Sequence, residues 1–449
     1  MKTSNYLFAL LAAACLLASC TKARLKEDIS PLAADKALST ATLNLTAIPG
    51  APGDPNIKYF GRWNFGDTSQ YTNYWGGGYL RVKFTGTTIK MKVGHPTHYF
   101  AKIDNGPWVS YLNASGTINL TPTPLSSGTH TISVAQGKDY DYLFNFQGFI
   151  LDAGATTSAP SAATDLIEWI GDSITAGYTD AQANVSGYPW VCSELLGTEH
   201  TQIAYPGITL VSGYANEGSM EVQYFKQRNS SQANSPDWDF TRYTPKIIVI
   251  NLGTNDNGKQ VPDAQFQSSY IAFLANIRNK FPNAEIFVMR TFINVKTTPT
   301  LAAVNARIAA GDNKLHYINT DGWMTNADYT DGLHPSVSGN IKAANLLKPI
   351  LEPYLTGVPA SAVTFYQDVN YGGAASQPIP VGNYTLSQMA AKGIPNDWAS
   401  SVKVPAGRTL IMYADDNFSG TSWTRTSDTP NFTTLSPNAN DQVSSIKVQ

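Results

Sequence analysis

The sequence LIEWIGDSITAG, at residues 166–177, decides how the middle of this chain of 449 residues folds. It begins with a short apolar run, LIEWI, rather than with the apolar–polar alternation of a strand that has one face in water. Similar runs occur at residues 245–252 and 284–289. Short apolar runs of this kind are typical of strands that are buried on both faces of a parallel sheet.

Helical patterns separate these apolar runs. Residues 266–281 place four large apolar side chains on one helical stripe: Tyr270, Phe273, Leu274 and Ile277. A final helix is expected at about residues 336–355. Strands that alternate with amphipathic helices predict a parallel sheet covered by helices on both faces. We expect this α/β domain to span residues 164–356.

Two further regions flank the α/β domain. Residues 80–84, 88–93 and 131–134 alternate apolar and polar side chains between breaks rich in Gly and Pro. This alternation predicts an all-β sandwich over residues 41–154, followed by a linker rich in Thr, Ser, Ala and Pro. Residues 362–449 form a third, C-terminal region, so the chain is predicted to be multidomain.

The composition argues against a nucleic-acid-binding protein. Charged residues make up 14% of the chain, and the formal net charge is −2. No basic surplus is therefore available to attract phosphate groups. The abundance of Thr, Asn, Ser, Gly and Tyr favours β-sandwich domains with polar loops, of the kind found outside cells.

The N-terminus has the features of a targeting segment. After Lys2, the apolar run at residues 6–18 is too short for the ~20 residues of a membrane span. It ends in LASC, which resembles the lipobox of bacterial lipoproteins. The resemblance implies a signal peptide at residues 1–19, a lipid on Cys20 and a tether at residues 20–40. It places the protein on a membrane of the cell envelope; an ordinary signal peptide with a chance Cys is the alternative.

Cysteine usage agrees with this interpretation. Cys15 would leave with the signal peptide and Cys20 would carry the lipid, so Cys192 has no partner for an internal disulfide. Cys192 lies in an apolar helical pattern and is expected to be buried. The domains must therefore be stabilised by their cores.

Gly171-Asp172-Ser173 directly follows the first apolar run. In an open α/β sheet, ligands bind beyond the carboxyl ends of the strands. A serine at a strand-to-helix turn presents its hydroxyl there, beside backbone N–H groups that can stabilise an oxyanion. By itself, the tripeptide is also compatible with a simple turn and helix N-cap.

Three more motifs occupy comparable places. They are AYPG at residues 204–207, GTND at residues 253–256 and DGLHP at residues 331–335. Together with Gly-Asp-Ser, and in this order, they resemble the four sequence blocks of SGNH (GDSL-like) hydrolases over residues 165–355. The resemblance implies Ser173 as nucleophile, His334 as base and Asp331 as the group that orients the base. It also implies an oxyanion hole built from the backbone N–H groups of Ser173 and Gly207 and the side-chain amide of Asn255.

These residue types suit ester hydrolysis. A hydroxyl becomes a good nucleophile when a neutral imidazole takes its proton, and rigid amide donors stabilise the charge that develops on the carbonyl oxygen. No cofactor is implied for catalysis. Some relatives orient the histidine with a backbone carbonyl, and Asp328 is a nearby substitute for Asp331. The other histidines are expected to be structural or surface residues: His95, His98, His130, His200 and His316.

The sandwich region contains YFGRW at residues 59–63 and WGGG at residues 75–78. A jelly-roll-like sandwich ahead of an SGNH domain resembles carbohydrate esterase family two, whose members remove acetyl groups from plant polysaccharides such as xylan and glucomannan. One interpretation is that Trp63 and Trp75 stack on sugar rings while Arg62 binds sugar hydroxyls. The alternative is that both tryptophans pack in the sandwich core.

The C-terminal region contains an internal repeat. Residues 366–373 match residues 413–420, and residues 396–401 match residues 440–445. The repeat resembles a microbial βγ-crystallin domain of two Greek-key motifs. The resemblance implies that two Asn-Asp-x-x-Ser-Ser loops bind Ca²⁺ through Asn396, Asp397, Ser400, Asn440, Asp441 and Ser444. Two duplicated polar turns without metal are the alternative.

The combined resemblances predict a lipid-anchored serine esterase that removes acetyl groups from cell-wall polysaccharide, of the acetylxylan or acetyl-glucomannan esterase type. The expected partners are the acetylated polysaccharide and the membrane, without nucleic acid, and the protein is expected to be a monomer. Two alternatives stay open. One is an SGNH esterase or lipase for another acyl ester, and the other is a non-catalytic carbohydrate-binding lipoprotein.

Overall fold

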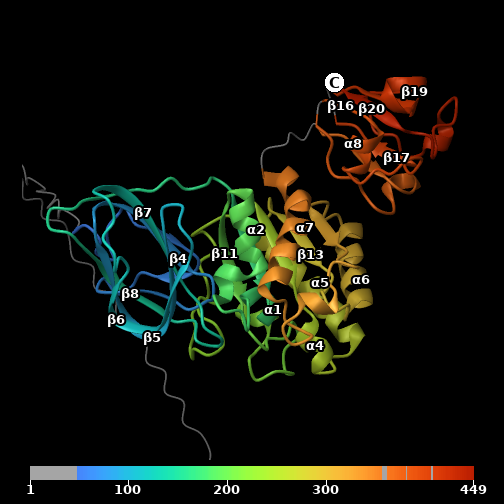
Figure 1. Cartoon of the computed structure of the whole chain (residues 1–449). Coiled ribbons are helices and arrows are strands. Elements are labelled where there is room, and N and C mark those ends of the chain that lie inside the picture. The colour runs from blue at the N-terminus through green and yellow to red at the C-terminus, as the bar shows by residue number, and fades with distance from the viewer. Residues whose placement is uncertain (1–47, 356–361, 381, 406–407) are drawn as a thin grey trace, which may run out of the picture. The chain divides into compact units, whose positions relative to one another are not determined.

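The computed structural model describes residues 48–355, 362–380, 382–405 and 408–449 (Figure 1). The signal peptide, the lipidated Cys20 and the tether that the sequence predicts all lie outside the described residues. Within the described part of the chain, no helix is both long enough and apolar enough to cross a membrane.

A nine-stranded antiparallel sheet forms the N-terminal β-sandwich, as predicted. Its strands are β1 (Lys58–Phe60), β2 (Trp63–Asn64), β3 (Tyr71–Asn73), β4 (Tyr79–Gly86), β5 (Ile89–Ile103), β6 (Val109–Asn119), β7 (Gly128–Gln136), β8 (Phe144–Leu151) and β9 (Thr157–Ser158). The order is β1-β4-β7-β5-β8-β3-β2, with β6 paired to β5 and β9 to β4. In β4, Leu80, Val82 and Phe84 face the core, while Arg81 and Lys83 are partly exposed on the other face.

Five parallel strands form the sheet of the central domain, in the order β11-β10-β12-β13-β14. They are β10 (Leu166–Gly171), β11 (Glu199–Ala204), β12 (Ile247–Asn251), β13 (Glu285–Met289) and β14 (Leu315–Ile318). The chain passes from β10 to β11 on one side and then returns to the other side of β10 for β12. The carboxyl ends of β10 and β12 therefore flank the switch point at which open α/β sheets bind ligands.

Helices cover both faces of this sheet, as the alternating pattern predicted (Figure 1). They are α1 (Ser173–Ala176), α2 (Tyr188–Leu196), α3 (Met220–Gln223), α4 (Thr254–Gly258), α5 (Asp263–Lys280), α6 (Thr297–Ala309) and α7 (Val337–Leu355), with the 3-10 turns η1 (Ala183–Ser186) and η2 (Asn326–Asp328). Ile248 and Ile250 of β12 pack in the core that contains α5 and α6. Ile247 and Val249 pack in the opposite core with α2 and α7, where Cys192 is buried as predicted.

The C-terminal region folds into a β domain with its own core. Its elements are β15 (Thr364–Tyr366), β16 (Gly382–Tyr384), β17 (Ser401–Lys403), β18 (Leu410–Asp415), β19 (Ser419–Arg425), β20 (Ser445–Val448), α8 (Leu386–Ala390), η3 (Val369–Tyr371), η4 (Asp416–Phe418) and η5 (Phe432–Thr434). The two copies of the repeat have the same local structure: Gly373 and Gly420 both have positive φ, and a Cβ on either would meet a carboxylate, that of Asp368 or Asp415. Strand β16 of the first copy pairs with β20 of the second, so the copies share one sheet.

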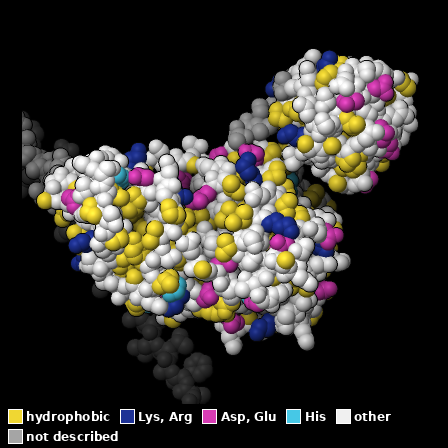
Figure 2. Space-filling model, in the orientation of Figure 1, with side chains coloured by type: hydrophobic (Ala, Val, Ile, Leu, Met, Phe, Trp, Pro, Cys, Tyr) yellow, Lys and Arg dark blue, Asp and Glu magenta, His cyan; other side chains and the backbone are white. Residues whose placement is uncertain are grey.

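Charged side chains are sparse on the face of the molecule that Figure 2 shows, and basic and acidic groups are interspersed there. This distribution agrees with the small net charge of −2. Nucleic-acid binding relies on a basic surface that neutralises phosphates. The described residues on this face do not form such a surface.

Candidate active site

Ser173 lies at the turn from β10 into α1, at the carboxyl edge of the parallel sheet. Asp172 caps the helix, because its Oδ1 accepts a hydrogen bond from the Ile174 N–H at 3.0 Å. Gly171 has no room for a side chain, since a Cβ there would lie 2.0 Å from Thr175 Oγ1. The Gly-Asp-Ser sequence thus forms a tight turn with Ser173 at the first helical position.

The Ser173 hydroxyl contacts the ring of His334. Ser173 Oγ lies 2.9 Å from His334 Nε2, although 161 positions separate the two residues. The two residues are only 5% and 8% exposed. Their separation is within the range that transfer of the hydroxyl proton to the imidazole requires.

Asp331 lies on the other side of the imidazole. Its Oδ2 is 2.7 Å from His334 Nδ1, and its Oδ1 accepts hydrogen bonds from the backbone N–H groups of His334 and Leu333, at 2.7 and 3.0 Å. Burial favours a higher pKa, but these hydrogen bonds outweigh it and lower the pKa of Asp331 to about 2. The ionised carboxylate can hold the ring in the tautomer that leaves Nε2 free to accept a proton.

Neither Asp328 nor a backbone carbonyl orients His334 in this structure. Asp328 is turned away, because its carboxylate pairs with Lys342 Nζ at 2.7 Å and accepts the Thr325 N–H at 2.8 Å. His334 Nδ1 is bonded to the Asp331 carboxylate instead of a backbone carbonyl. The structure therefore brings together Ser173, His334 and Asp331.

Gly207 and Asn255, the other residues predicted for the oxyanion hole, lie on neighbouring segments of the chain. Gly207 follows β11 and has a φ of 77°, which favours glycine. Asn255 lies in α4, directly after β12, and its Nδ2 donates to the Ile208 carbonyl at 2.9 Å. This bond holds the amide against the Gly207 loop, and the amide has a second N–H to donate. The structure thus gathers amide donors at the same edge of the sheet as Ser173.

Three carboxyl groups organise the loops around this edge: Asp172 and Asp256, which are buried, and Asp180, which is partly buried. Burial raises the pKa of Asp172 and of Asp180 to about 7, and that of Asp256 to about 6. Asp256 accepts the N–H groups of Leu210 and Val211, at 2.8 and 3.1 Å, and so holds the loop that contains Gly207. Asp180 accepts a hydrogen bond from Asn340 Nδ2 at 2.9 Å, which joins the loop after α1 to α7.

The sandwich also contributes a residue to this site, Tyr140, which the sequence patterns did not predict. Tyr140, on the loop between β7 and β8, lies with its ring centroid 5.8 Å from those of Tyr178 and Tyr205. Tyr178 in turn lies 4.8 Å from the His334 ring. Because Tyr140 is 45% exposed, it forms part of the rim of the site. The available signal was the cluster of acidic and aromatic residues at 139–142.

Two protein families match this chain, in the predicted order. Residues 59–160 match the carbohydrate esterase 2 N-terminal family, and residues 169–340 match the GDSL-like lipase/acylhydrolase family. The chain combines a CE2 N-terminal domain with a GDSL-like hydrolase domain. Both resemblances, to SGNH hydrolases and to carbohydrate esterase family two, are therefore confirmed.

Several known proteins are similar to this chain over about two thirds of its length. The cellulase/esterase CelE of Acetivibrio thermocellus is 25% identical over 309 residues, which are 64% of this chain but only 38% of that protein. An acetylxylan esterase / glucomannan deacetylase of Cellvibrio japonicus is 24% identical over 312 residues, 62% of this chain and 84% of that protein. The structure of a family two carbohydrate esterase from Clostridium thermocellum, in complex with cellohexaose, has a TM-score of 0.60 at 24% identity and covers 67% of this chain and 99% of its own.

The tryptophans of the CE2 N-terminal domain do not form a sugar platform, so that interpretation was wrong. Trp63 and Trp75 are each 1% exposed. Trp63 packs against the ring of Phe144 in the sandwich core. Trp75 reaches the GDSL-like domain, where its Nε1 donates to the Gln227 carbonyl at 3.0 Å. The alternative interpretation, that both tryptophans pack in the sandwich core, is correct for Trp63 only, because Trp75 packs in the core of the GDSL-like domain.

Arg62 is also buried and joins the two domains. Its guanidinium lies 4.9 Å from the centre of the Tyr224 ring, and its Nη1 donates to the Lys226 carbonyl at 2.8 Å. Its Nη2 is 3.9 Å from the carboxylate of Glu168, and both side chains are fully buried. Glu168 belongs to β10, the strand that leads to Ser173. The Gly-Arg-Trp segment therefore docks the sandwich onto the catalytic sheet, and this burial prevents Arg62 from binding sugar hydroxyls.

The five remaining histidines have structural surroundings. His95, His130 and His316 lie 2.7–2.8 Å from the carboxylates of Asp141, Asp104 and Glu285 respectively, and His98 Nδ1 accepts the Asn113 N–H at 3.0 Å. His200 is buried between aromatic rings, and burial lowers its pKa to about 3. Across the described ranges, no group of three or more His, Cys, Asp or Glu side chains is placed to hold a metal ion.

The two predicted calcium loops share one geometry. Asp397 and Asp441 both have positive φ, 53° and 52°. The side-chain amides of Asn396 and Asn440 donate to these aspartates, at 2.7 and 2.8 Å. The Ser444 hydroxyl of the second loop donates to Asn396 Oδ1 of the first at 2.8 Å. The two loops thus bring oxygen atoms of both copies together, and oxygen is the ligand that Ca²⁺ takes.

Proposed function

We propose that this protein is a serine esterase that removes acetyl groups from a cell-wall polysaccharide. The observation that carries the proposal is the 2.9 Å contact between Ser173 Oγ and His334 Nε2, with Asp331 on the other ring nitrogen. Ser173 attacks the acetyl carbonyl while His334 takes its proton. The sugar hydroxyl leaves with that proton. A water molecule, deprotonated by His334, then attacks the acetyl-enzyme; the bond to Ser173 Oγ breaks, His334 returns the proton to that oxygen, and acetate leaves.

The negative charge of both tetrahedral intermediates falls on the former carbonyl oxygen. The backbone N–H groups of Ser173 and Gly207 and the amide of Asn255 are the proposed donors to that oxygen. Loss of one such donor typically costs about 3–4 kcal/mol of transition-state stabilisation. Because the Asn255 amide is already held by the Ile208 carbonyl, it needs little reorganisation during the reaction.

Two observations support a carbohydrate substrate. Tyr140, Tyr178 and Tyr205 supply rings with polar hydroxyls beside the reacting groups, and such amphipathic rings suit a sugar, which has both apolar C–H faces and hydroxyls. The Cellvibrio japonicus relative is an acetylxylan esterase / glucomannan deacetylase. Proteins of that activity act on acetylated polymers, and we assign the same substrate class to this chain.

The test is release of acetate from acetylated xylan and acetylated glucomannan, compared with hydrolysis of p-nitrophenyl acetate, butyrate and octanoate. We expect both polymers to be deacetylated and the rate on the small esters to fall with acyl length. Ser173→Ala is the control for background hydrolysis. A preference for octanoate favours an esterase or lipase for another acyl ester. Binding of polysaccharide without any hydrolysis favours a non-catalytic lipoprotein.

We also propose that Cys20 carries a lipid that anchors the protein to a membrane of the cell envelope. The support is the LASC sequence at residues 17–20, which ends a short apolar run. Cys20→Ser should move the protein from the membrane fraction to the soluble fraction, and mass spectrometry of the wild-type N-terminal peptide should show diacylglycerol on the cysteine. Equal membrane retention of the variant contradicts the proposal.

A third proposal concerns Ca²⁺ in the C-terminal domain. Asn396, Asp397 and Ser400 of one loop, with Asn440, Asp441 and Ser444 of the other, would hold it. The support is the matching geometry of the loops and the bond between Asn396 and Ser444. An ion that binds only the folded state at 100 times its Kd stabilises it by about 2.7 kcal/mol. Chelation should therefore lower Tm in wild type but not in the double variant Asp397→Asn, Asp441→Asn, and an unchanged wild-type Tm contradicts Ca²⁺ binding.

A further inference from the structure

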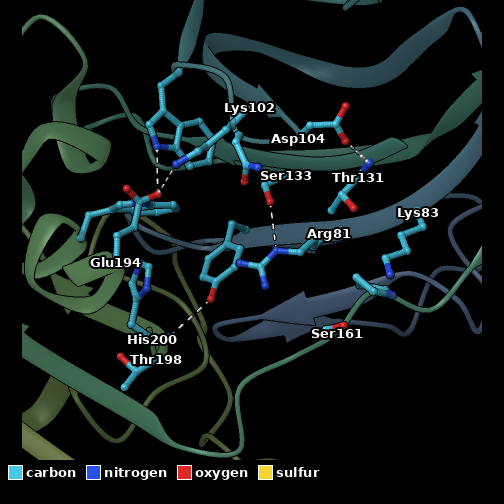
Figure 3. Close-up of a pocket in the computed structure, with 15 residues that line it drawn as sticks. Arg81, Lys83, Lys102, Asp104, Thr131, Ser133, Ser161, Glu194, Thr198 and His200 are labelled. Carbon is cyan, nitrogen blue, oxygen red and sulfur yellow. Dashed lines mark hydrogen bonds and ion pairs between the residues drawn. The ribbon is translucent and has the colours of Figure 1, made fainter. Parts of the chain in front are cut away.

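A cavity of about 460 Å³ opens where the sandwich meets α2 of the GDSL-like domain (Figure 3). Outward-facing side chains of β4, β5 and β7 line one wall. The opposite wall consists of α2, the linker at Pro160 and Ser161, and the start of β11. Small-molecule sites in proteins typically measure ~300–1,000 Å³, so the cavity is large enough for a ligand.

This cavity is separate from the candidate active site. Thr198 and His200, which line it, lie at the amino end of β11, whereas Ser173 follows the carboxyl end of the neighbouring parallel strand β10. Six residues of strand separate the two edges, which corresponds to about 20 Å. A small molecule in the cavity therefore does not reach the Ser173 hydroxyl, whereas a polymer is long enough to span a separation of about 20 Å.

The sandwich wall of the cavity is a polar face on which cross-strand neighbours form rows of polar side chains. Arg81, Ser133 and Lys102 face one another across β4, β7 and β5, and Lys83 is paired with Thr131 in the next row. Strand alternation turns these side chains away from the sandwich core. Figure 3 shows Arg81 and Ser133 in the middle of the cavity, with Lys102 and Glu194 on one side and Lys83 on the other. The wall thus offers several closely spaced donors and acceptors.

Most charges around the cavity are already paired. Arg81 Nη1 lies 2.8 Å from Glu199, and Lys102 Nζ lies 3.1 Å from Glu194. Asp104 bonds His130 at 2.7 Å. The cavity therefore combines many polar groups with little net charge, which suits a neutral ligand rich in hydroxyls. An anionic ligand would compete with the acids that already hold Arg81 and Lys102.

An anchored indole completes the wall. Trp108 is half-buried, and its ring packs edge to face with Trp190 at 5.2 Å. Its Nε1 donates to Glu194 at 3.3 Å, so the ring is held in place by both packing and a hydrogen bond. A fixed aromatic ring beside clustered hydroxyl-binding groups matches the two kinds of surface that a pyranose presents.

We propose that this cavity is a second glycan-binding site, specific for a neutral oligosaccharide segment. Its role follows from, and rests on, the proposed deacetylase function. A polymer held at this site presents its acetyl groups to Ser173 at a high effective concentration. The site would thus raise the efficiency on polymers without taking part in the reaction.

Calorimetric titration of the Ser173→Ala protein with unacetylated xylohexaose, mannohexaose and cellohexaose tests the site directly. Thr131→Trp, added to Ser173→Ala, should fill the cavity and remove one binding site per protein. The matched control is Thr117→Trp, because Thr117 is an exposed threonine on β6 that does not line the cavity. Trp108→Ala, as a second variant, should weaken binding by about tenfold, equivalent to about 1.4 kcal/mol.

Three results would overturn the proposal. The first is equal stoichiometry and affinity for the Thr131→Trp and Thr117→Trp proteins. The second is the absence of binding for all three hexaoses in the Ser173→Ala protein. The third is a preference for trigalacturonate, with an affinity that collapses in high salt, since this would indicate an acidic ligand.

A kinetic experiment separates failure of this site from failure of the proposed function. In the protein with Ser173 intact, Thr131→Trp should lower the ratio of kcat/KM on acetylated xylan to kcat/KM on p-nitrophenyl acetate by about tenfold. Thr117→Trp should leave this ratio at the wild-type value, and an equal ratio in both variants contradicts the second site. If wild type hydrolyses no ester at all, the deacetylase function fails, while the calorimetric result still decides whether the cavity binds a glycan.

Discussion

The turns at Gly171-Asp172-Ser173 and Gly61-Arg62-Trp63 look alike in the sequence but have different roles. Each places a polar residue within two positions of a glycine: Ser173 in the first turn and Arg62 in the second. Both polar side chains become almost completely buried. Arg62 is surrounded by carbonyls, a carboxylate and aromatic rings of the other domain. Ser173 instead contacts an imidazole that is itself oriented by a carboxylate. The partners of a buried polar group, more than the group itself, separate a structural role from a chemical one.

The largest expected effect comes from Ser173→Ala. Removal of the hydroxyl should lower kcat on p-nitrophenyl acetate by at least about 10⁴-fold, because nucleophile and base act as a unit. Tm should stay at the wild-type value, since the substitution leaves no buried charge unpaired. A variant that retains more than a few per cent of wild-type kcat would contradict the role of Ser173.

Asp331→Asn should have the next largest effect on rate, with a loss of up to about 10⁴-fold in kcat, because an amide neither fixes the productive tautomer nor stabilises the imidazolium. Asp328→Asn is the matched control, since Asp328 pairs with Lys342 and not with His334. The prediction is checked by steady-state kinetics on p-nitrophenyl acetate. Similar rates for the two variants would favour the dyad oriented by a backbone carbonyl.

Arg62→Met tests the structural role of the second buried polar residue in the comparison, Arg62. It should lower the free energy of unfolding by about 3–5 kcal/mol, because Glu168 would remain buried without its cationic partner. Arg242→Met is the control: Arg242 is exposed and lies 4.7 Å from the centre of the Phe65 ring at the same domain boundary, so its loss should cost less than about 0.5 kcal/mol. Urea unfolding measures the free energy of unfolding of both variants. Equal values for Arg62→Met and Arg242→Met would show that the buried pair of Arg62 and Glu168 does not hold the domains together.

Asn255→Ala should lower kcat by about 10²–10³-fold with little change in KM, because an oxyanion donor acts mainly in the transition state. The measurement is kcat and KM on p-nitrophenyl acetate. A rise in KM at constant kcat would instead place Asn255 in ground-state binding.

The smallest effect concerns the pH dependence of stability. Burial raises the pKa of Asp180 to about 7, so the folded state favours the protonated carboxyl. The stability that this provides is fully present below about pH 4, the unfolded pKa, and is lost as pH rises toward 7. Asp180→Asn mimics the neutral form of the carboxyl group. The decrease in Tm between pH 4.5 and pH 8 should therefore be smaller in this variant than in wild type. Asp239→Asn, at an exposed carboxylate whose pKa is lowered, is the control and should not reduce the loss.

Local patterns in the sequence were sufficient to predict the secondary structure and the order of the domains. The apolar run before Ser173, the stripe on α5 and the alternation in β4 are all buried where the pattern placed them. These predictions succeed because burial of apolar area dominates folding, and strand and helix periods display that burial over a few residues. The four short sequence motifs at residues 171–173, 204–207, 253–256 and 331–335 likewise predicted which segments meet at the carboxyl edge of the sheet.

Only the tertiary structure decided which polar groups face solvent and which domain supplies them. The sequence does not indicate that Arg62 is enclosed by the GDSL-like domain, that Tyr140 of the sandwich reaches the rim of the active site, or that Arg81 and Lys102 border a cavity. The physical reason is that exposure of a side chain depends on surfaces from distant parts of the chain. A local period records which face of a strand is buried, but it carries no information about what packs against the other face.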